Sequence, residues 1–158
     1  MRFDKMLTIN QCNEYIDYFN SQDYYKDNQV KDSDIIHNSS KAMDLCISLR
    51  STIEDSTGLI LQPHRAWIRK YNKGNILHRH WDGEADYALS ILLGQSDDLE
   101  NPLLIYYTDE PTKVILQTGD GYFFNGGVIE HERKAVQSEY IYGMYLGYMK
   151  TDKKVSLL

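Results

Sequence analysis

Apolar residues recur with a helical period in the first third of the chain. Between residues 8 and 20 the spacing of apolar positions is that of one helix face: Cys12, Tyr15, Ile16 and Phe19. Thr8, followed three positions later by Gln11, forms a capping-box pattern at the start of this segment. A second stripe predicts a helix over residues 41–56, and Gly58 is placed to end it. Its members are Ala42, Leu45, Cys46, Leu49 and Ile53.

After Gly58 the pattern changes to short runs that are typical of β-strands. We expect strands over residues 59–62, 66–71, 76–82, 87–93, 103–108, 113–117, 122–125, 128–136 and 140–149. The polar segment 21–40 predicts a loop with a short strand near 34–37, and residues 151–158 predict a frayed tail. Two helices followed by a series of short strands indicate an α+β fold with a sandwich or barrel of strands.

Composition adds limits to this picture. The chain has 158 residues, enough for one domain with a real core, and 42% apolar with 25% charged residues is typical of a globular protein. Thirteen Tyr against four Phe indicates half-buried strand positions or a cavity with polar walls. A net charge of −6 gives no general attraction to nucleic acid or to an acidic membrane surface.

Location follows from what the sequence lacks and from its cysteines. No apolar run approaches the roughly 18 residues of a membrane-spanning helix, and the N-terminus has no hydrophobic leader. Cys12 and Cys46 each fall on a helical stripe, which favours reduced core residues over a disulfide framework. We therefore expect a cytoplasmic protein that binds neither a membrane nor nucleic acid.

The segment from Tyr71 to Asp82 carries candidate metal ligands. His80 and Asp82 are two residues apart, so in a strand their side chains share a face, while Trp81 between them points away and is expected to pack. His131, in a later strand, is placed to supply a third ligand. Two His and one carboxylate with open positions is the arrangement of non-haem Fe(II) oxygenases.

In order and spacing these residues resemble the 2-oxoglutarate/Fe(II)-dependent dioxygenase superfamily, especially its prolyl-4-hydroxylase-like branch. Tyr71, Gly74, His80 and Asp82 stand where that branch has a Tyr, a Gly turn and an H-x-D. The segment Gly119-Asp120-Gly121-Tyr122-Phe123-Phe124 matches its Gly turn and aromatic strand, and His131 matches its distal His. The resemblance covers roughly residues 7–149.

The resemblance implies a single domain over residues 1–158. A double-stranded β-helix (jelly-roll) core would occupy about 59–149, with two N-terminal helices, over about 7–57, packed on one sheet. It implies Fe(II) held by His80, Asp82 and His131, with 2-oxoglutarate and O₂ as cosubstrates. The reaction would be hydroxylation of a peptide, such as a prolyl peptide, or of a small molecule.

One position departs from the branch. It places an Arg or Lys nine or ten residues after the distal His, to bind the distal carboxylate of 2-oxoglutarate, and here those residues are Tyr140 and Ile141. Either another cation substitutes or the cosubstrate is not 2-oxoglutarate, because a buried carboxylate needs a partner. By strand alternation Arg69 shares the face of Tyr71 and Arg133 that of His131.

These two arginines are the candidate substitutes. The hydroxyls of Tyr71 and Tyr140 are candidate donors to the same carboxylate. The competing interpretation is that Arg69 and Arg133 are solvent-facing strand charges.

Two other functional interpretations stay open. His78, His80, Glu84 and His131 can be read as a cupin-type metal site that uses no 2-oxoglutarate, although the second cupin motif lacks its usual Pro. The chain can also be a β-sandwich binding protein whose His and Tyr residues only pack.

Overall fold

The computed structural model describes residues 1–152 and contains two long helices. Helix α1 (Ile9–Ser21) begins at Thr8, and both hydrogen bonds of the predicted capping box with Gln11 are present. Helix α2 (Ser40–Thr57) begins at Ser39 and ends at Gly58, whose φ of 72° lies in the left-handed region. No helix in the described part of the chain has the length and apolarity needed to cross a membrane.

The strands form two antiparallel sheets. In spatial order, the larger sheet consists of β1 (Arg2–Phe3), β8 (Gly121–Phe124), β5 (Tyr87–Gln95), β10 (Tyr140–Lys150), β3 (Leu61–Asn72) and β2 (Asp34–His37). The smaller sheet consists of β4 (Leu77–His80), β9 (His131–Arg133), β6 (Leu103–Ile105) and β7 (Thr112–Val114). Two antiparallel sheets with two helices are consistent with the jelly roll that the sequence predicted.

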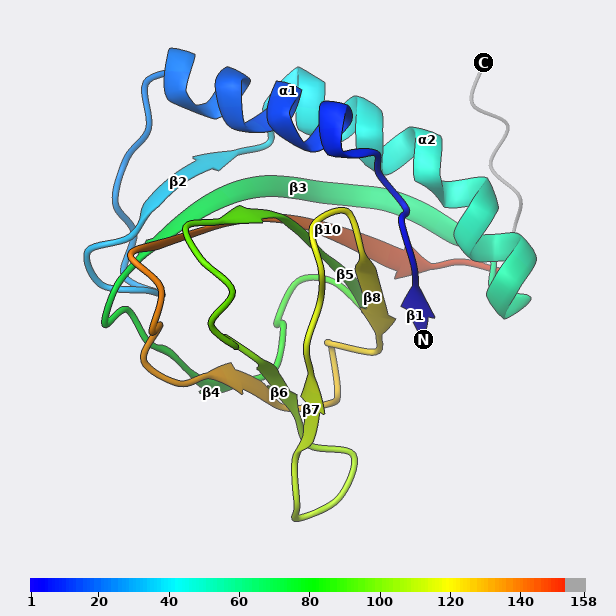
Figure 1. Ribbon diagram of the computed structural model, residues 1–158. Coiled ribbons are helices and arrows are strands. Elements are labelled where there is room, and N and C mark those ends of the chain that lie inside the picture. Colours follow the sequence, from blue (N-terminus) through cyan, green and yellow to red (C-terminus); the bar gives the residue numbers. More distant parts are fainter. Residues whose placement is uncertain (153–158) are drawn as a thin grey trace.

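The helices cover one face of the larger sheet, and the smaller sheet lies on its other side (Figure 1). Between helices and sheet lies the main apolar core, which includes Cys12, Phe19, Cys46 and Ile53. Both cysteines are free and buried, as the helical stripes predicted. The helices therefore support the sheet from outside, and the space between the two sheets is left for the site.

The strand boundaries differ from the prediction at several places. The predicted segments 59–62 and 66–71 are joined in one continuous strand, β3, which begins at Leu61. Strand β10 pairs with it along its whole length, Pro63 included, and the register shifts by one residue between Gly147 and Tyr148. Strand β1 was not predicted, and β6 and β9 are shorter than the runs 103–108 and 128–136. Residues 153–158 of the predicted tail lie outside the described residues.

Candidate metal centre

Two of the three candidate ligands lie in paired strands of the smaller sheet, and the third follows one of these strands. His80 is the last residue of β4, and His131 is the first residue of β9, directly opposite it in the antiparallel register. Asp82 follows two residues after β4, and its backbone N–H donates to the Gly126 carbonyl at 2.7 Å. Strand pairing thus brings together residues about fifty positions apart in the chain.

These three side chains lie close together but are too far apart to form hydrogen bonds with one another. The Nε2 atoms of His80 and His131 are each 3.7 Å from Asp82 Oδ1, and one ligand atom from each residue lies within 4.8 Å of the others. Separations of 3.7 Å are longer than hydrogen bonds. Asp82 and His131 are buried and His80 is half-buried. A divalent cation between them would meet two imidazole nitrogens and a carboxylate oxygen, a donor set that suits Fe(II).

Both imidazoles are oriented by backbone carbonyls. His80 Nδ1 lies 2.7 Å from the His78 carbonyl oxygen, and His131 Nδ1 lies 3.1 Å from the Ile129 carbonyl oxygen. A carbonyl only accepts hydrogen bonds, so each Nδ1 carries the proton and donates. Each Nε2 then has a lone pair directed at the cluster, which is how metal-binding histidines are usually oriented.

The local electrostatics differ between the two histidines. Burial lowers the pKa of His131, and this outweighs the attraction of the Asp82 carboxylate. Burial also opposes protonation of His80, but the Asp82 carboxylate and the His78 carbonyl favour the charged ring more strongly, so the pKa of His80 is raised. Asp82 therefore stabilises positive charge at this point, whether it is a proton or a metal ion.

His78 and Glu84 do not join this cluster. The register between Leu77 and His80 contains an extra residue relative to β9, because Leu77 pairs with Arg133 and His80 with His131. This bulge breaks the alternation that would have put His78 on the face of His80, and His78 is exposed. The side chain of Glu84 is 75% exposed and binds Arg65 at 2.8 Å. The cupin-type ligand set is therefore not assembled.

A small cavity beside the ligands, here called the metal pocket, is also lined by Arg69, Tyr71 and Arg133. Arg69 is 1% exposed and fully engaged: its guanidinium donates to both Asp27 carboxylate oxygens at 2.9 and 2.7 Å, to Ser33 Oγ at 2.6 Å and to Gln29 Oε1 at 2.9 Å. Arg69 is thus not a solvent-facing strand charge, but its charge is already neutralised by a residue of the 22–33 loop.

Arg133 is in a different state. It is 9% exposed, its Nη1 donates to the Asn101 carbonyl, and its Nε has no hydrogen-bond partner among the described residues. The Tyr71 ring lies near both guanidinium groups, with its centroid 5.3 Å from Arg133 Cζ and 5.9 Å from Arg69 Cζ. Burial raises the pKa of Tyr71, so its hydroxyl is protonated at neutral pH and can donate. A buried cation with an unused donor faces the metal pocket.

Tyr140 lies elsewhere. It pairs with Asn72, whereas its neighbour Ile141 pairs with Tyr71. Opposite residues share a face of the sheet, so Ile141 is on the side of Tyr71 and Tyr140 is on the helix-covered side. Tyr140 is 39% exposed and lines neither the metal pocket nor the larger cavity described below.

Sequence reasoning missed the loop residues at this site. Asp27 and Gln29 belong to the polar segment 21–40, which shows no periodicity that could place them. Gln29 Nε2 lies 3.3 Å from His80 Nε2, so this amide must give way when an ion binds His80. Trp67 and Tyr145, stacked with centroids 5.8 Å apart, also line the metal pocket.

Comparison with known proteins gives fold relatives only. No protein-family model and no curated protein matches the sequence. Among solved structures, a viral collagen prolyl hydroxylase from Paramecium Bursaria Chlorella virus-1 matches with TM-score 0.75 and 13% identity, over 94% of each chain. A Pseudomonas putida prolyl-4-hydroxylase matches with TM-score 0.77 and 13% identity, over 96% of this chain and 92% of that one.

The chain has the fold of the 2-oxoglutarate/Fe(II) oxygenases. A further structure with this oxygenase fold, HygX from Streptomyces hygroscopicus, holds nickel and 2-oxoglutarate and matches with TM-score 0.76 and 10% identity, over 96% of this chain and 83% of that one. The viral hydroxylase structure is itself a complex with 2-oxoglutarate. The predicted resemblance is confirmed at the level of the fold.

Removing a ligand should abolish metal binding without unfolding the protein. We expect Asp82→Ala and His131→Ala to lower the affinity for Ni(II), measured by calorimetry, by at least about 100-fold, the upper end of what is lost when only a ligand's hydrogen-bond partner is removed. His78→Ala and Glu84→Ala are the matched controls and should bind like the parent protein. Loss of binding in Glu84→Ala would contradict the ligand assignment.

Gly126 should be needed to position Asp82. A Cβ at Gly126 would overlap Asp82 Oδ2 and approach the Ala88 Cβ to 3.2 Å, whereas a Cβ at Gly83 meets nothing within 4 Å. Gly126→Ala should therefore weaken Ni(II) binding at least about tenfold, a loss typical of disturbed ligand orientation, while Gly83→Ala leaves it unchanged. Equal affinities in the two variants would argue against this role of Gly126.

Proposed function

We propose that the protein is a non-haem Fe(II) and 2-oxoglutarate-dependent dioxygenase, an oxidoreductase that hydroxylates a peptide or small-molecule substrate. The observation that carries this proposal is the cluster of His80, Asp82 and His131, with both Nε2 atoms directed at one point and a buried cation nearby. Fold relatives that hold 2-oxoglutarate and nickel support it. If the chain were only a β-sandwich binding protein, this arrangement of ligands would have no function.

In the proposed site each residue has a distinct task. His80, Asp82 and His131 would hold Fe(II) on one side and leave its other positions for the cosubstrate and O₂. The bound metal and cosubstrate would supply the oxidising power for attack on an unactivated C–H bond, while the protein supplies orientation and excludes water. The backbone carbonyls of His78 and Ile129 keep the two rings in the binding tautomer.

Arg133, rather than Arg69, is the proposed partner of the cosubstrate's distal carboxylate. Arg69 already binds Asp27 through both terminal nitrogens, so it would have to break a buried ion pair to help. Arg133 has an unused Nε donor, and Tyr71 beside it offers a protonated hydroxyl. A carboxylate with these two donors would be stabilised by charge-assisted hydrogen bonds.

We infer that the two facing sheets are the double-stranded β-helix of this oxygenase fold, that α1 and α2 support its larger sheet, and that residues 1–158 form one domain. The helix packing on β3, β5 and β10 supports this inference.

Trp81 is the proposed substrate contact beside the metal ligands. Trp81 was expected to pack, but it is 60% exposed beside Asp82, because the strand ends at His80 and its outer side is open to solvent. An exposed Trp next to a ligand is a candidate substrate contact. Fold relatives include prolyl hydroxylases and a HygX complex with hygromycin B, so a prolyl peptide and a small polar molecule are both candidate substrates.

The cosubstrate assignment predicts a spectroscopic signature. Addition of Fe(II) and 2-oxoglutarate to the protein under anaerobic conditions should give a weak visible charge-transfer band. Arg133→Leu should raise the 2-oxoglutarate concentration that gives half of the maximal band intensity about tenfold or more, because a hydrogen bond to a charged group contributes about 1.5–3 kcal/mol. Arg79→Leu is the control, since Arg79 is half-exposed on neighbouring β4 and binds Glu130. Metal binding without any band would refute the dioxygenase assignment.

A further inference from the structure

The metal pocket borders a larger cavity between the sheets, here called the chamber. The metal pocket has a volume of about 30 Å³ and the chamber about 490 Å³. Both are lined by the same four residues, Ser90, Leu103, Arg133 and Tyr145, which therefore form a neck between them. The Tyr145 ring lies against Gly143, in space that a Cβ would otherwise fill.

The volumes of the metal pocket and the chamber indicate where a bound cosubstrate would extend. At roughly 10–15 Å³ per water, the metal pocket has room for about two water molecules. A 2-oxo acid that binds the metal therefore needs space beyond this pocket, and the chamber past the neck lies within the roughly 300–1,000 Å³ range of ligand sites. Arg69 in the metal pocket is already paired with Asp27, so Arg133, at the neck, is the first cation without a carboxylate partner among the described residues that its tail meets.

Beyond Arg133 the chamber changes character. One part of its wall is apolar and is made by Leu92, Leu103, Val114, Leu116 and Ile141, whereas Ser90, Gln95, Gln117 and Thr118 are uncharged polar residues of the same lining. Ile141 is the residue ten positions after His131, where the resemblance expects a cation, and it is 1% exposed. The chamber therefore has an apolar side chain, Ile141, at the position where the resemblance expects a cation that binds a carboxylate.

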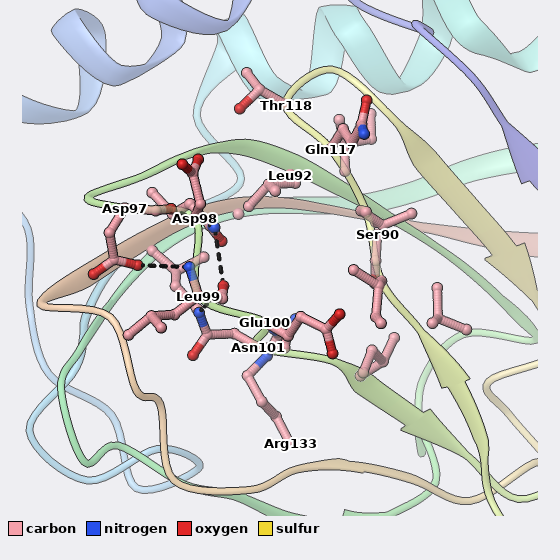
Figure 2. Close-up of a pocket in the computed structure, with 18 of the residues that line it drawn as sticks. Ser90, Leu92, Asp97, Asp98, Leu99, Glu100, Asn101, Gln117, Thr118 and Arg133 are labelled. Atoms are coloured by element: carbon pink, nitrogen blue, oxygen red, sulfur yellow. Dashed lines mark hydrogen bonds between the residues drawn. The ribbon is translucent and has the colours of Figure 1, made fainter.

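The far mouth of the chamber is acidic. Asp97, Asp98 and Glu100 lie on the segment that follows β5, and the Arg133 side chain extends toward Asn101 from the strand opposite (Figure 2). Among the described residues that line the chamber, Arg133 alone carries a positive charge. A carboxylate that reaches past Arg133 therefore meets no second cation and then negative charge, which disfavours it.

We propose that the chamber is a distal extension of the cosubstrate site, which accepts 2-oxo acids with long, uncharged, apolar tails in addition to 2-oxoglutarate. This rests on the proposed function. The distal carboxylate of 2-oxoglutarate would end at Arg133 and would accept a hydrogen bond from the unused Nε–H of this residue. A straight-chain apolar 2-oxo acid continues through the neck and buries its tail against Leu92, Leu116 and Ile141. A longer dicarboxylate carries its second charge into the acidic end and is rejected.

The test is calorimetric binding of a series of 2-oxo acids to the Ni(II)-loaded protein. From 2-oxobutanoate through 2-oxohexanoate to 2-oxooctanoate, affinity should rise by roughly fourfold per added methylene, as expected for burial of apolar surface. 2-Oxoadipate should bind more weakly than 2-oxoglutarate. An affinity that stays flat or falls with tail length would overturn the proposal while leaving the dioxygenase assignment intact.

Two variants locate the tail. Leu116→Trp narrows the chamber and should lower the affinity for 2-oxooctanoate at least tenfold more than that for 2-oxoglutarate. Lys113→Trp, an exposed position of the same segment, should leave the ratio of the two affinities unchanged. Equal ratios in both variants would place the tail elsewhere and refute the extension.

Two further outcomes separate the proposals. If 2-oxooctanoate binds equally well without Ni(II), it is held by the chamber alone and is not a metal-bound cosubstrate, which overturns the extension. If neither 2-oxoglutarate nor any other 2-oxo acid of the series binds the Ni(II)-loaded protein, the proposed function itself fails.

Discussion

The candidate site depends on the pairing register of β4 with β9. This register sets His80 opposite His131, and a single bulged residue after Leu77 turns His78 away from the cluster. Because side chains alternate along a strand, a shift of one residue would exchange the ligand face for the solvent face. Arg133 depends on the same register, since it lies two residues after His131 and opposite Leu77, whose side chain also lines the metal pocket.

Strand alternation explains what the sequence could predict. It correctly placed Arg133 with His131, which both lie in β9, and His80 with Asp82, although Asp82 lies two residues after the end of β4. It failed for His78 because a bulge leaves no clear mark in a single sequence. The two helices and the cores they bury were predictable from periodicity and capping residues, whereas the continuity of β3 past Pro63 depends on its partner β10.

The sequence pattern could not predict which arginine is paired with a carboxylate from a distant part of the chain. Arg69 and Arg133 looked alike as candidate cations, since each stood two residues from a site residue. They differ because the 22–33 loop folds back and supplies Asp27 to Arg69, and nothing in the local pattern of either segment encodes that pairing. Likewise Tyr140 and Ile141 could be told apart only by register, which gives Ile141 the site face of β10.

An unused donor does not by itself identify a ligand site. Arg65 also has a buried Nε without a hydrogen-bond partner among the described residues, but it binds Glu84, stacks on Trp67 with its Cζ 4.8 Å from the ring centroid, and borders neither cavity. Its charge is therefore compensated. Arg133 has no carboxylate partner among the ion pairs of residues 1–152, and burial of an uncompensated charge costs stability. The burial of the Arg133 charge at the neck between the metal pocket and the chamber is better explained by binding of an anionic ligand than by packing.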